Sequence, residues 1–412
     1  MKYKYSGNFP IRTFIALVLI GFFTRLSYSL ARNPVLPLFA MALGASPSII
    51  GLVVGISTVT GIIFKAPAGA LSDIYGRRVI LLISTLIFSF IPFTYLFINN
   101  YILLIIIRFI HGFATAIYGP VAMASIIDIA GERKGQWTAT FSSISTIGSV
   151  ISAPLGGGLL YVLGGLNPSI EVFHFIYFIA GCIGSLSIIL IFISWKFLPY
   201  RESSTSPTMS AVMEKFRRDL LAVFKDVQVL LISSMEAVQN LTVGALEAFL
   251  PYYIVSIANL SSFHAGVLWS LQLTLLIILR PLMGRFSDIY GRKPFITFGM
   301  ILCASSFILY PITINFLTLC ILTIIFGLGE AMVTSSTAAM VAEQSKVHGY
   351  GVSMGVFGSL WDIGHALGPI ITGILLEKFN YILSFSIISS TLFIFTILFQ
   401  IYVKERLNPF KS

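Results

Sequence analysis

The sequence predicts an all-α membrane protein whose twelve transmembrane helices form two pseudo-symmetric six-helix bundles. Hydrophobic residues make up 57% of the 412 residues and charged residues only 10%, whereas a soluble domain needs a more highly charged surface. Apolar stretches long enough to cross a bilayer recur along the whole chain. A loop pattern of the first half also returns in the second half, which indicates an internal duplication.

The expected spans are helices rather than barrel strands, because they are long and spaced by glycines. The first span starts beside basic residues, as a secretory signal does, but Arg25 interrupts it and no small-residue cleavage site follows. We therefore expect a retained first helix, on which Arg25 and Arg32 share one face. The twelve spans are expected at about residues 13–41, 48–68, 79–98, 101–127, 137–163, 173–195, 228–254, 263–284, 294–314, 316–341, 350–376 and 381–403.

The distribution of Lys and Arg predicts the orientation of the spans. Basic residues occupy the N-terminus, every second connection and the C-terminal tail, while the opposite connections contain only Lys378. Both termini are therefore expected in the cytoplasm, with the chain in the plasma (cell inner) membrane. The net charge of +10 reflects this bias, so a nucleic-acid partner is not expected.

The expected domains are an N-terminal six-helix bundle at 1–195, a cytoplasmic linker at 196–227 and a C-terminal six-helix bundle at 228–412. Apolar residues of the linker recur at helical spacing among basic residues, namely Val212, Phe216, Leu220, Val223 and Val227. This spacing predicts an amphipathic helix on the cytoplasmic membrane surface. A tether between the halves is favoured over a regulatory element.

The repeated pattern is Gly69-x-x-Ser-Asp73-Ile-Tyr-Gly76-Arg77-Arg78, which returns 215 positions later as Gly284-x-x-Ser-Asp288-Ile-Tyr-Gly291-Arg292-Lys293. The same offset links Gly112 to Gly327, Asp128 to Glu343 and Pro154 to Pro369. The glycines of each copy permit a tight loop between close-packed helices. The arginines keep the loop in the cytoplasm, and the carboxylate at a helix end can face arginines or positive helix N-termini.

With this loop pattern in both halves, the chain resembles the major facilitator superfamily over nearly its whole length. Arg108-Phe-Ile-His-Gly112-Phe-Ala-Thr-Ala116 is similar to the second motif of that family. The run Ala153-Pro154-Leu-Gly156-Gly157 resembles the antiporter motif of its twelve-span drug:proton antiporters, although Ala153 stands where those proteins usually have glycine.

The resemblance implies a conformational latch in the repeated loop. It implies that Asp73 meets the start of span 11, near 349–351, when a transporter of this family is open outward. It also implies an ion pair between Arg77 and Asp128. A simple topology signal is the alternative, but it would not need the aspartate and the two glycines.

Seven charged residues are expected inside the membrane, where each charge costs about 2.5–3.5 kcal/mol and therefore invites a functional explanation. They are Arg25, Arg32, Arg108, Glu236, Glu247, Glu330 and Asp362. The resemblance implies that spans 1, 4, 7 and 10, which hold all but Asp362, line a central cavity. The first half supplies arginines and the second half carboxylates.

Two interpretations of these charges remain open. In the first, Arg32 and Arg108 form structural or gating bridges with Glu247. In the second, Glu330, Asp362 or Glu247 carries a proton, because burial disfavours the charged form of a carboxylate that lacks a cationic neighbour. A bridge is favoured for Glu247, and Glu236 is expected to be a solvated entrance residue nearer the cytoplasm.

The sequence contains no His-Glu-x-x-His, P-loop or Cys/His cluster. We therefore expect neither an enzyme nor an ATP-driven pump, and no cofactor or metal. The resemblance implies a secondary active transporter that exports amphipathic or drug-like small molecules in exchange for protons, working as a monomer in the lipid bilayer. Arg25 and Arg32 stand where cation exporters often have a carboxylate, which suggests anionic or zwitterionic substrates or a role for these arginines in bridges. Proton-coupled uptake of an organic anion stays open, because the arginines of the cavity favour it, although the antiporter motif disfavours it. The sequence is also compatible with a flippase for lipid or lipid-linked substrates and with a membrane sensor that transports nothing.

Overall fold

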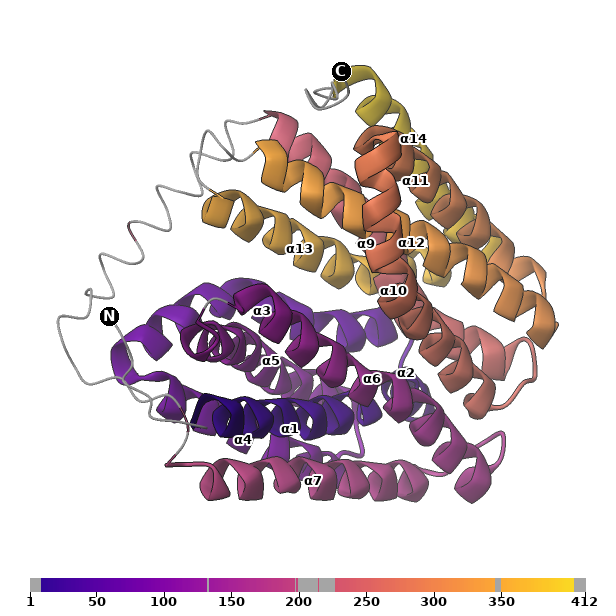
Figure 1. The fold of residues 1–412 in the computed structure, drawn as a ribbon. Helices are drawn as coiled ribbons and strands as arrows, with labels where there is room; N and C mark the ends of the chain where they lie inside the picture. The colour runs from indigo at the N-terminus through magenta and orange to yellow at the C-terminus, as the bar shows by residue number, and fades with distance from the viewer. Residues whose placement is uncertain are drawn as a thin grey trace, which may run out of the picture. The chain divides into compact units, whose positions relative to one another are not determined.

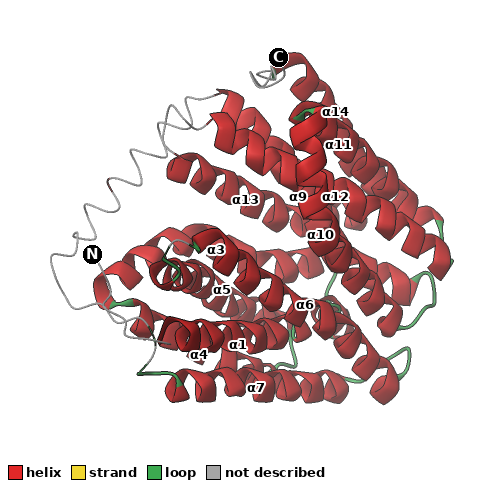
Figure 2. Ribbon diagram, in the orientation of Figure 1, coloured by secondary structure: helices red, strands yellow, loops and turns green. Residues whose placement is uncertain are grey.

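The structure is a computed structural model that describes residues 9–131, 133–196, 198, 214, 227–344 and 350–403. Within these residues the chain is helical, with short connecting loops and no strand (Figure 2). Twelve helical segments are long and apolar enough to cross a membrane. The predicted number of spans is therefore confirmed for the described part of the chain, whereas the predicted linker helix lies almost entirely outside it.

The first half contains seven helices and one short 3-10 turn, in the order drawn in Figure 1. They are α1 (Phe9–Leu30), α2 (Val35–Ala42), α3 (Pro47–Tyr75), α4 (Arg77–Thr94), η1 (Tyr95–Phe97), α5 (Tyr101–Ile129), α6 (Lys134–Gly164) and α7 (Ile170–Ile193). The second half contains α9 (Val227–Ser256), α10 (Ser262–Tyr290), α11 (Arg292–Leu309), η2 (Tyr310–Ile312), α12 (Phe316–Gln344), α13 (Tyr350–Lys378) and α14 (Tyr381–Tyr402).

The first predicted span is interrupted. Helix α1 ends at Leu30 and α2 begins at Val35, so Arg32 lies in the turn between them. Pro34 has no N–H to donate and therefore cannot continue the hydrogen bonds of α1. The expectation that Arg25 and Arg32 share one face of a continuous helix is wrong for this reason.

The duplication seen in the sequence is present in the backbone. Helices α3, α4 and α5 and the turn η1 begin and end 215 residues before α10, α11, α12 and η2. The helix packing repeats as well: α1 packs against α6 and α7, as α9 packs against α13 and α14. Likewise α4 packs against α5 and α7, as α11 packs against α12 and α14.

The chain forms two compact units. The first takes its described residues from Met1–Ala45, Ile56–Glu214 and Ser261–Ser270, and the second from Ser46–Gly55, Lys215–Leu260 and Leu271–Ser412. The boundaries therefore cross α3 and α10 instead of following the ends of the expected domains. Each unit has a buried interior; aromatic residues such as Phe88 and Tyr118 contribute to the first, and Phe307 and Phe326 to the second.

Candidate functional site

The first copy of the repeated loop is held by ion pairs around Arg77. Gly76 joins α3 to α4 at a φ of 90°, a left-handed conformation that glycine adopts without strain. Arg77 contacts Asp73 at 2.7 Å and Asp128 at 3.2 Å, and it donates to Ser72 Oγ. The pairing of Arg77 with Asp128 is thus confirmed.

The second copy repeats this arrangement. Gly291 has a φ of 102°, and Arg292 pairs with Asp288 and, at 2.9 Å, with Glu343. Arg292 also donates to Ser287 Oγ at 2.9 Å. The same network of ion pairs therefore occurs in both copies of the loop.

One expectation about this loop is wrong. Gly69 lies inside α3, and a Cβ atom built there would meet no described atom within 4 Å. In the second copy, the nearest described atom to a Cβ on Gly284 is Ser335 Cβ at 3.8 Å. Gly76 and Gly291 make the turn, so neither Gly69 nor Gly284 is required by close packing among the described residues.

Sequence reasoning missed what the last basic residue of each loop contacts. Arg78 donates to the carbonyl of Leu198 at 2.9 Å, and its guanidinium lies 5.1 Å from the ring centre of Trp195. Lys293 donates to the carbonyl of Gln400 at 2.9 Å. In the first half this residue therefore links the loop to the segment that follows α7, and in the second half it links the loop to the last turns of α14. The recurrence of a cation at this position was the available signal.

In the first unit, two arginines meet the same tyrosine. Arg108 on α5 is fully buried and donates to Ser57 Oγ on α3 at 2.6 Å. Its guanidinium lies 5.7 Å from the ring centre of Tyr28 on α1. Arg32 donates to the Tyr28 hydroxyl at 3.0 Å and lies 5.6 Å from the same ring centre. Arg25, by contrast, is exposed.

His111 completes this cationic cluster, which comprises Arg32, Arg108, Tyr28, Ser57 and His111. The His111 ring crosses that of Tyr28 edge to face at 5.0 Å. His111 Nδ1 lies 3.2 Å from the hydroxyl of Tyr95, within hydrogen-bonding distance. The cluster therefore combines two fixed positive charges with a buried aromatic wall, which suits an anionic or aromatic group.

In the second unit, two carboxylates are buried among neutral polar groups. Glu236 is only 2% exposed, and it accepts hydrogen bonds from Thr337 Oγ1 at 2.6 Å and Asn240 Nδ2 at 3.4 Å. Its burial contradicts the expectation of a solvated entrance residue. Glu330 is 5% exposed and accepts from Gln272 Nε2 at 2.9 Å.

These neutral partners were not found from the sequence, although amides in apolar spans were a visible signal. The charge of the exposed Arg280 attracts both carboxylates, and the charges of Glu236 and Glu330 repel each other. The two carboxylates and the neutral donors Thr337, Asn240 and Gln272 are called the carboxylate cluster below.

Glu247 has a partner inside its own unit. It contacts His365 Nε2 at 3.3 Å, and the His365 ring stacks on Trp361 at 5.2 Å. Asp362 lies one turn before His365 on α13 and is also buried. The interpretation that pairs Arg108 or Arg32 with Glu247 stays a prediction, since these residues belong to different units.

The residues of the span 5 motif lie in α6 at close helix contacts within the first unit. A Cβ on Gly156 would lie 3.0 Å from Val35 Cγ2, and one on Gly157 would lie 2.2 Å from the carbonyl of Ser262. Ser262 Oγ also donates to the carbonyl of Gly157 at 2.8 Å. Pro154 follows Ala153, whose carbonyl contacts Gly266. Small residues are therefore needed here for backbone contact.

Among the described residues, no group of three or more His, Cys, Asp or Glu side chains lies close enough to hold a metal ion. The polar groups that converge are the cationic cluster and the carboxylate cluster. Both clusters offer hydrogen-bonding and charged groups to a bound molecule.

A family model for the Major Facilitator Superfamily matches residues 17–276 and 233–411. The chain belongs to the major facilitator superfamily. It is therefore an integral membrane transporter of small molecules, and not an enzyme.

Curated relatives span most of the chain. An uncharacterized MFS-type transporter of Methanocaldococcus jannaschii is 24% identical over 369 residues, covering 89% of this chain and 90% of the relative. The staphylopine export protein of Staphylococcus aureus is 25% identical, covering 83% and 84%. Multidrug resistance protein MdtG of Proteus mirabilis is 24% identical, covering 87% and 88%.

Solved structures share the fold. A variant of the nucleoside transporter NupG has a TM-score of 0.78 at 15% identity, covering 95% of this chain and 100% of that one. A bacterial homolog of the human lysosomal transporter Spinster has a TM-score of 0.75 at 16% identity, covering 98% and 100%. At such identities the likeness shows the major facilitator fold alone.

Proposed function

We propose that this transporter works by alternating access and exports amphipathic or drug-like small molecules in exchange for protons. The observation that carries the proposal is the carboxylate cluster. The hydrogen bonds to Glu236 and Glu330 come from neutral donors, so either carboxyl group can take up a proton without breaking a direct ion pair.

The direction of transport is proposed from relatives and from the span 5 motif. Two relatives that align with more than four fifths of the chain are named for export or multidrug resistance. Pro154, Gly156 and Gly157 match the antiporter motif. We further propose a monomer in the plasma membrane with cytoplasmic termini, which places the loops of Arg77 and Arg292 on the cytoplasmic side.

Uptake of an organic anion is the second candidate function. It is favoured by Arg32 and Arg108, which bracket Tyr28 in the first unit and offer fixed positive charge to a carboxylate or sulfonate. An importer would concentrate such an anion on the cytoplasmic side together with protons.

The two functions are separated by transport into proteoliposomes with an imposed pH gradient. Ethidium and norfloxacin serve as drug-like probes and fluorescein as the organic anion. The proposal expects the drug-like probes to move in the direction opposite to the flow of protons. Movement of fluorescein with the protons, and of neither other probe, would favour the anion importer instead.

Asp73→Asn should reduce transport strongly while leaving the fold intact. Asp73 pairs with Arg77, but Arg77 keeps Asp128 as a second partner, and a half-exposed pair contributes only about 0.2–1 kcal/mol. Melting temperature and transport rate are compared with those of Asp288→Asn, the matched change in the second copy. Wild-type transport by Asp73→Asn, with a normal share of outward-accessible molecules in cysteine labelling, would exclude a latch.

Glu247 and His365 should be energetically coupled. The pair is buried and its atoms lie 3.3 Å apart, and contacting residues typically show coupling of about 0.5–3 kcal/mol. A double-mutant cycle with Glu247→Gln and His365→Gln, read by thermal unfolding, measures this coupling. Additive effects would show that the contact contributes nothing to stability.

A further inference from the structure

The second unit contains a pocket away from both the carboxylate cluster and the Arg292 loop. It lies where α9 and α13 end, where η2 turns and where α14 begins. Its volume is about 390 Å³, within the range of pockets that hold small molecules. All ten lining residues belong to the second unit, including Pro47 at the start of α3.

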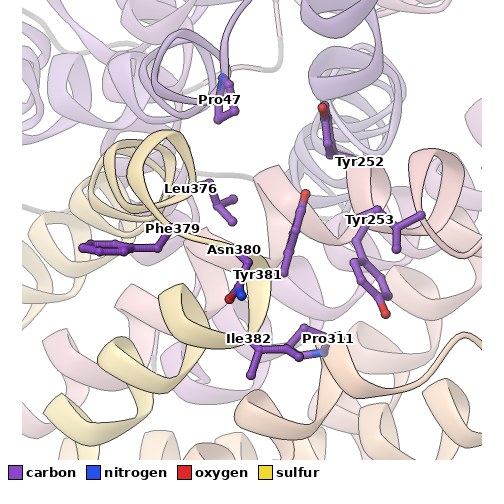
Figure 3. Close-up of a pocket in the computed structure, with 10 residues that line it drawn as sticks. Pro47, Tyr252, Tyr253, Pro311, Leu376, Phe379, Asn380, Tyr381 and Ile382 are labelled. Carbon is purple, nitrogen blue, oxygen red and sulfur yellow. The ribbon is translucent and has the colours of Figure 1, made fainter.

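The wall of the pocket is aromatic and uncharged. Tyr252, Tyr253, Phe379 and Tyr381 line it, and none of its ten lining residues is charged. Figure 3 shows Tyr381 between Asn380 on one side and Tyr252 and Tyr253 on the other. The Tyr381 ring lies 6.3 Å from that of Tyr252 and 5.2 Å from that of Tyr253. An ionised ligand would lose its hydration here without gaining a counter-charge.

The polar groups around the pocket can donate hydrogen bonds to a ligand. Asn380 uses its Oδ1 to accept from the Leu383 N–H at 2.8 Å, so its NH₂ group is what remains for a ligand. The hydroxyl of Tyr381 is buried and has no hydrogen-bond partner among the described residues. Tyr253, in contrast, donates to the carbonyl of Thr313. A ligand with an acceptor can therefore use the donors that remain on Asn380 and Tyr381.

A membrane-interface role does not explain Tyr381. Tyrosines at a membrane surface hold the hydroxyl toward water or lipid head groups, whereas the hydroxyl of Tyr381 is buried at the pocket and has no partner among the described residues. Lipid head groups also carry charge, for which the lining residues supply no partner.

We propose that this aromatic pocket binds a neutral aromatic small molecule that carries a hydrogen-bond acceptor. The proposal goes beyond the transport function, because binding here does not depend on which substrate crosses the membrane or on proton coupling. Occupation by lipid is the competing outcome of the test.

Benzophenone is a suitable probe because it is neutral, aromatic, carries one carbonyl acceptor and cross-links to nearby C–H bonds under light. The purified full chain in phosphatidylcholine nanodiscs is irradiated with it, and cross-linked peptides are mapped by mass spectrometry. Saturable labelling is expected at 252–257 and 376–382. Benzanilide, which keeps the carbonyl, should compete, and diphenylmethane, which lacks it, should compete at least severalfold less well.

Variants then assign the labelling to the pocket. Tyr381→Phe removes only the hydroxyl, so the half-saturating concentration of benzophenone should rise about five- to tenfold, as expected for one lost hydrogen bond. Tyr402→Phe is the matched control at the other end of the same helix and should change nothing. Leu376→Trp should fill the pocket and abolish labelling while the melting temperature stays near that of the wild type.

Three results would overturn the proposal. They are labelling that does not saturate, labelling that survives Leu376→Trp in folded protein, and labelling seen in detergent but lost in nanodiscs. The last result would show that lipid occupies the pocket.

Discussion

Replacing Arg108 with alanine should abolish transport, and replacing it with lysine should restore little. Arg108 is fully buried, donates to Ser57 Oγ and lies over the ring of Tyr28. Lysine keeps the charge but lacks the planar guanidinium that meets both partners at once. Initial rates in proteoliposomes, for protein matched in amount and melting temperature, give the comparison.

Ser57→Ala is the control for this prediction. It removes one hydrogen bond to a charged group, an interaction that contributes about 1.5–3 kcal/mol, and it leaves Arg108 over Tyr28. Transport should therefore fall without disappearing. If Arg108→Lys transports as well as the wild type, positive charge alone is sufficient and the geometry of the cationic cluster is unimportant.

Neutralising Glu330 should abolish gradient-driven transport while leaving substrate binding or exchange measurable. Glu330 is buried on α12 and held by the neutral amide of Gln272. A proton carrier must lose its proton to one side of the membrane and regain it from the other. Glu330→Gln imitates the protonated state permanently, so downhill exchange can continue but accumulation cannot.

Two further variants locate the carrier. Glu236→Gln tests the other buried carboxylate of the cluster. The double variant Glu330→Gln with Asp362→Asn removes two of the three carriers considered from the sequence. If this double variant still releases protons on substrate addition and still accumulates substrate, neither residue carries the proton. Loss of folding together with binding would instead indicate a structural carboxylate.

The fold was predictable because the sequence features that determine it recur along the whole chain. Apolar spans of sufficient length and one repeated loop predict twelve helices in two related halves, and the loop reappears as the ion pairs of Arg77 and Arg292. The break in the first span was missed because long apolar stretches lie before Arg32 and after Pro34. Averaged over such a window, hydropathy predicts one continuous helix.

The site was less predictable, because partners depend on packing between helices that are far apart in sequence. The charged residues themselves stand out in apolar spans, but nothing in the sequence links Glu330 to Gln272 or Glu236 to Thr337. The expectation that Glu236 is solvated was also wrong. It was based on the position of Glu236 along α9, whereas its burial depends on the neighbouring helices.

Proton coupling is the central claim, and one measurement addresses it directly. Proteoliposomes containing the wild-type protein receive ethidium or norfloxacin with and without an imposed pH gradient, while a pH-sensitive dye reports proton flux. The proposed mechanism predicts uphill accumulation only with the gradient, proton movement in the opposite direction, and loss of both in Glu330→Gln. Accumulation that is equal with and without the gradient, or substrate movement with no accompanying proton flux, would contradict it.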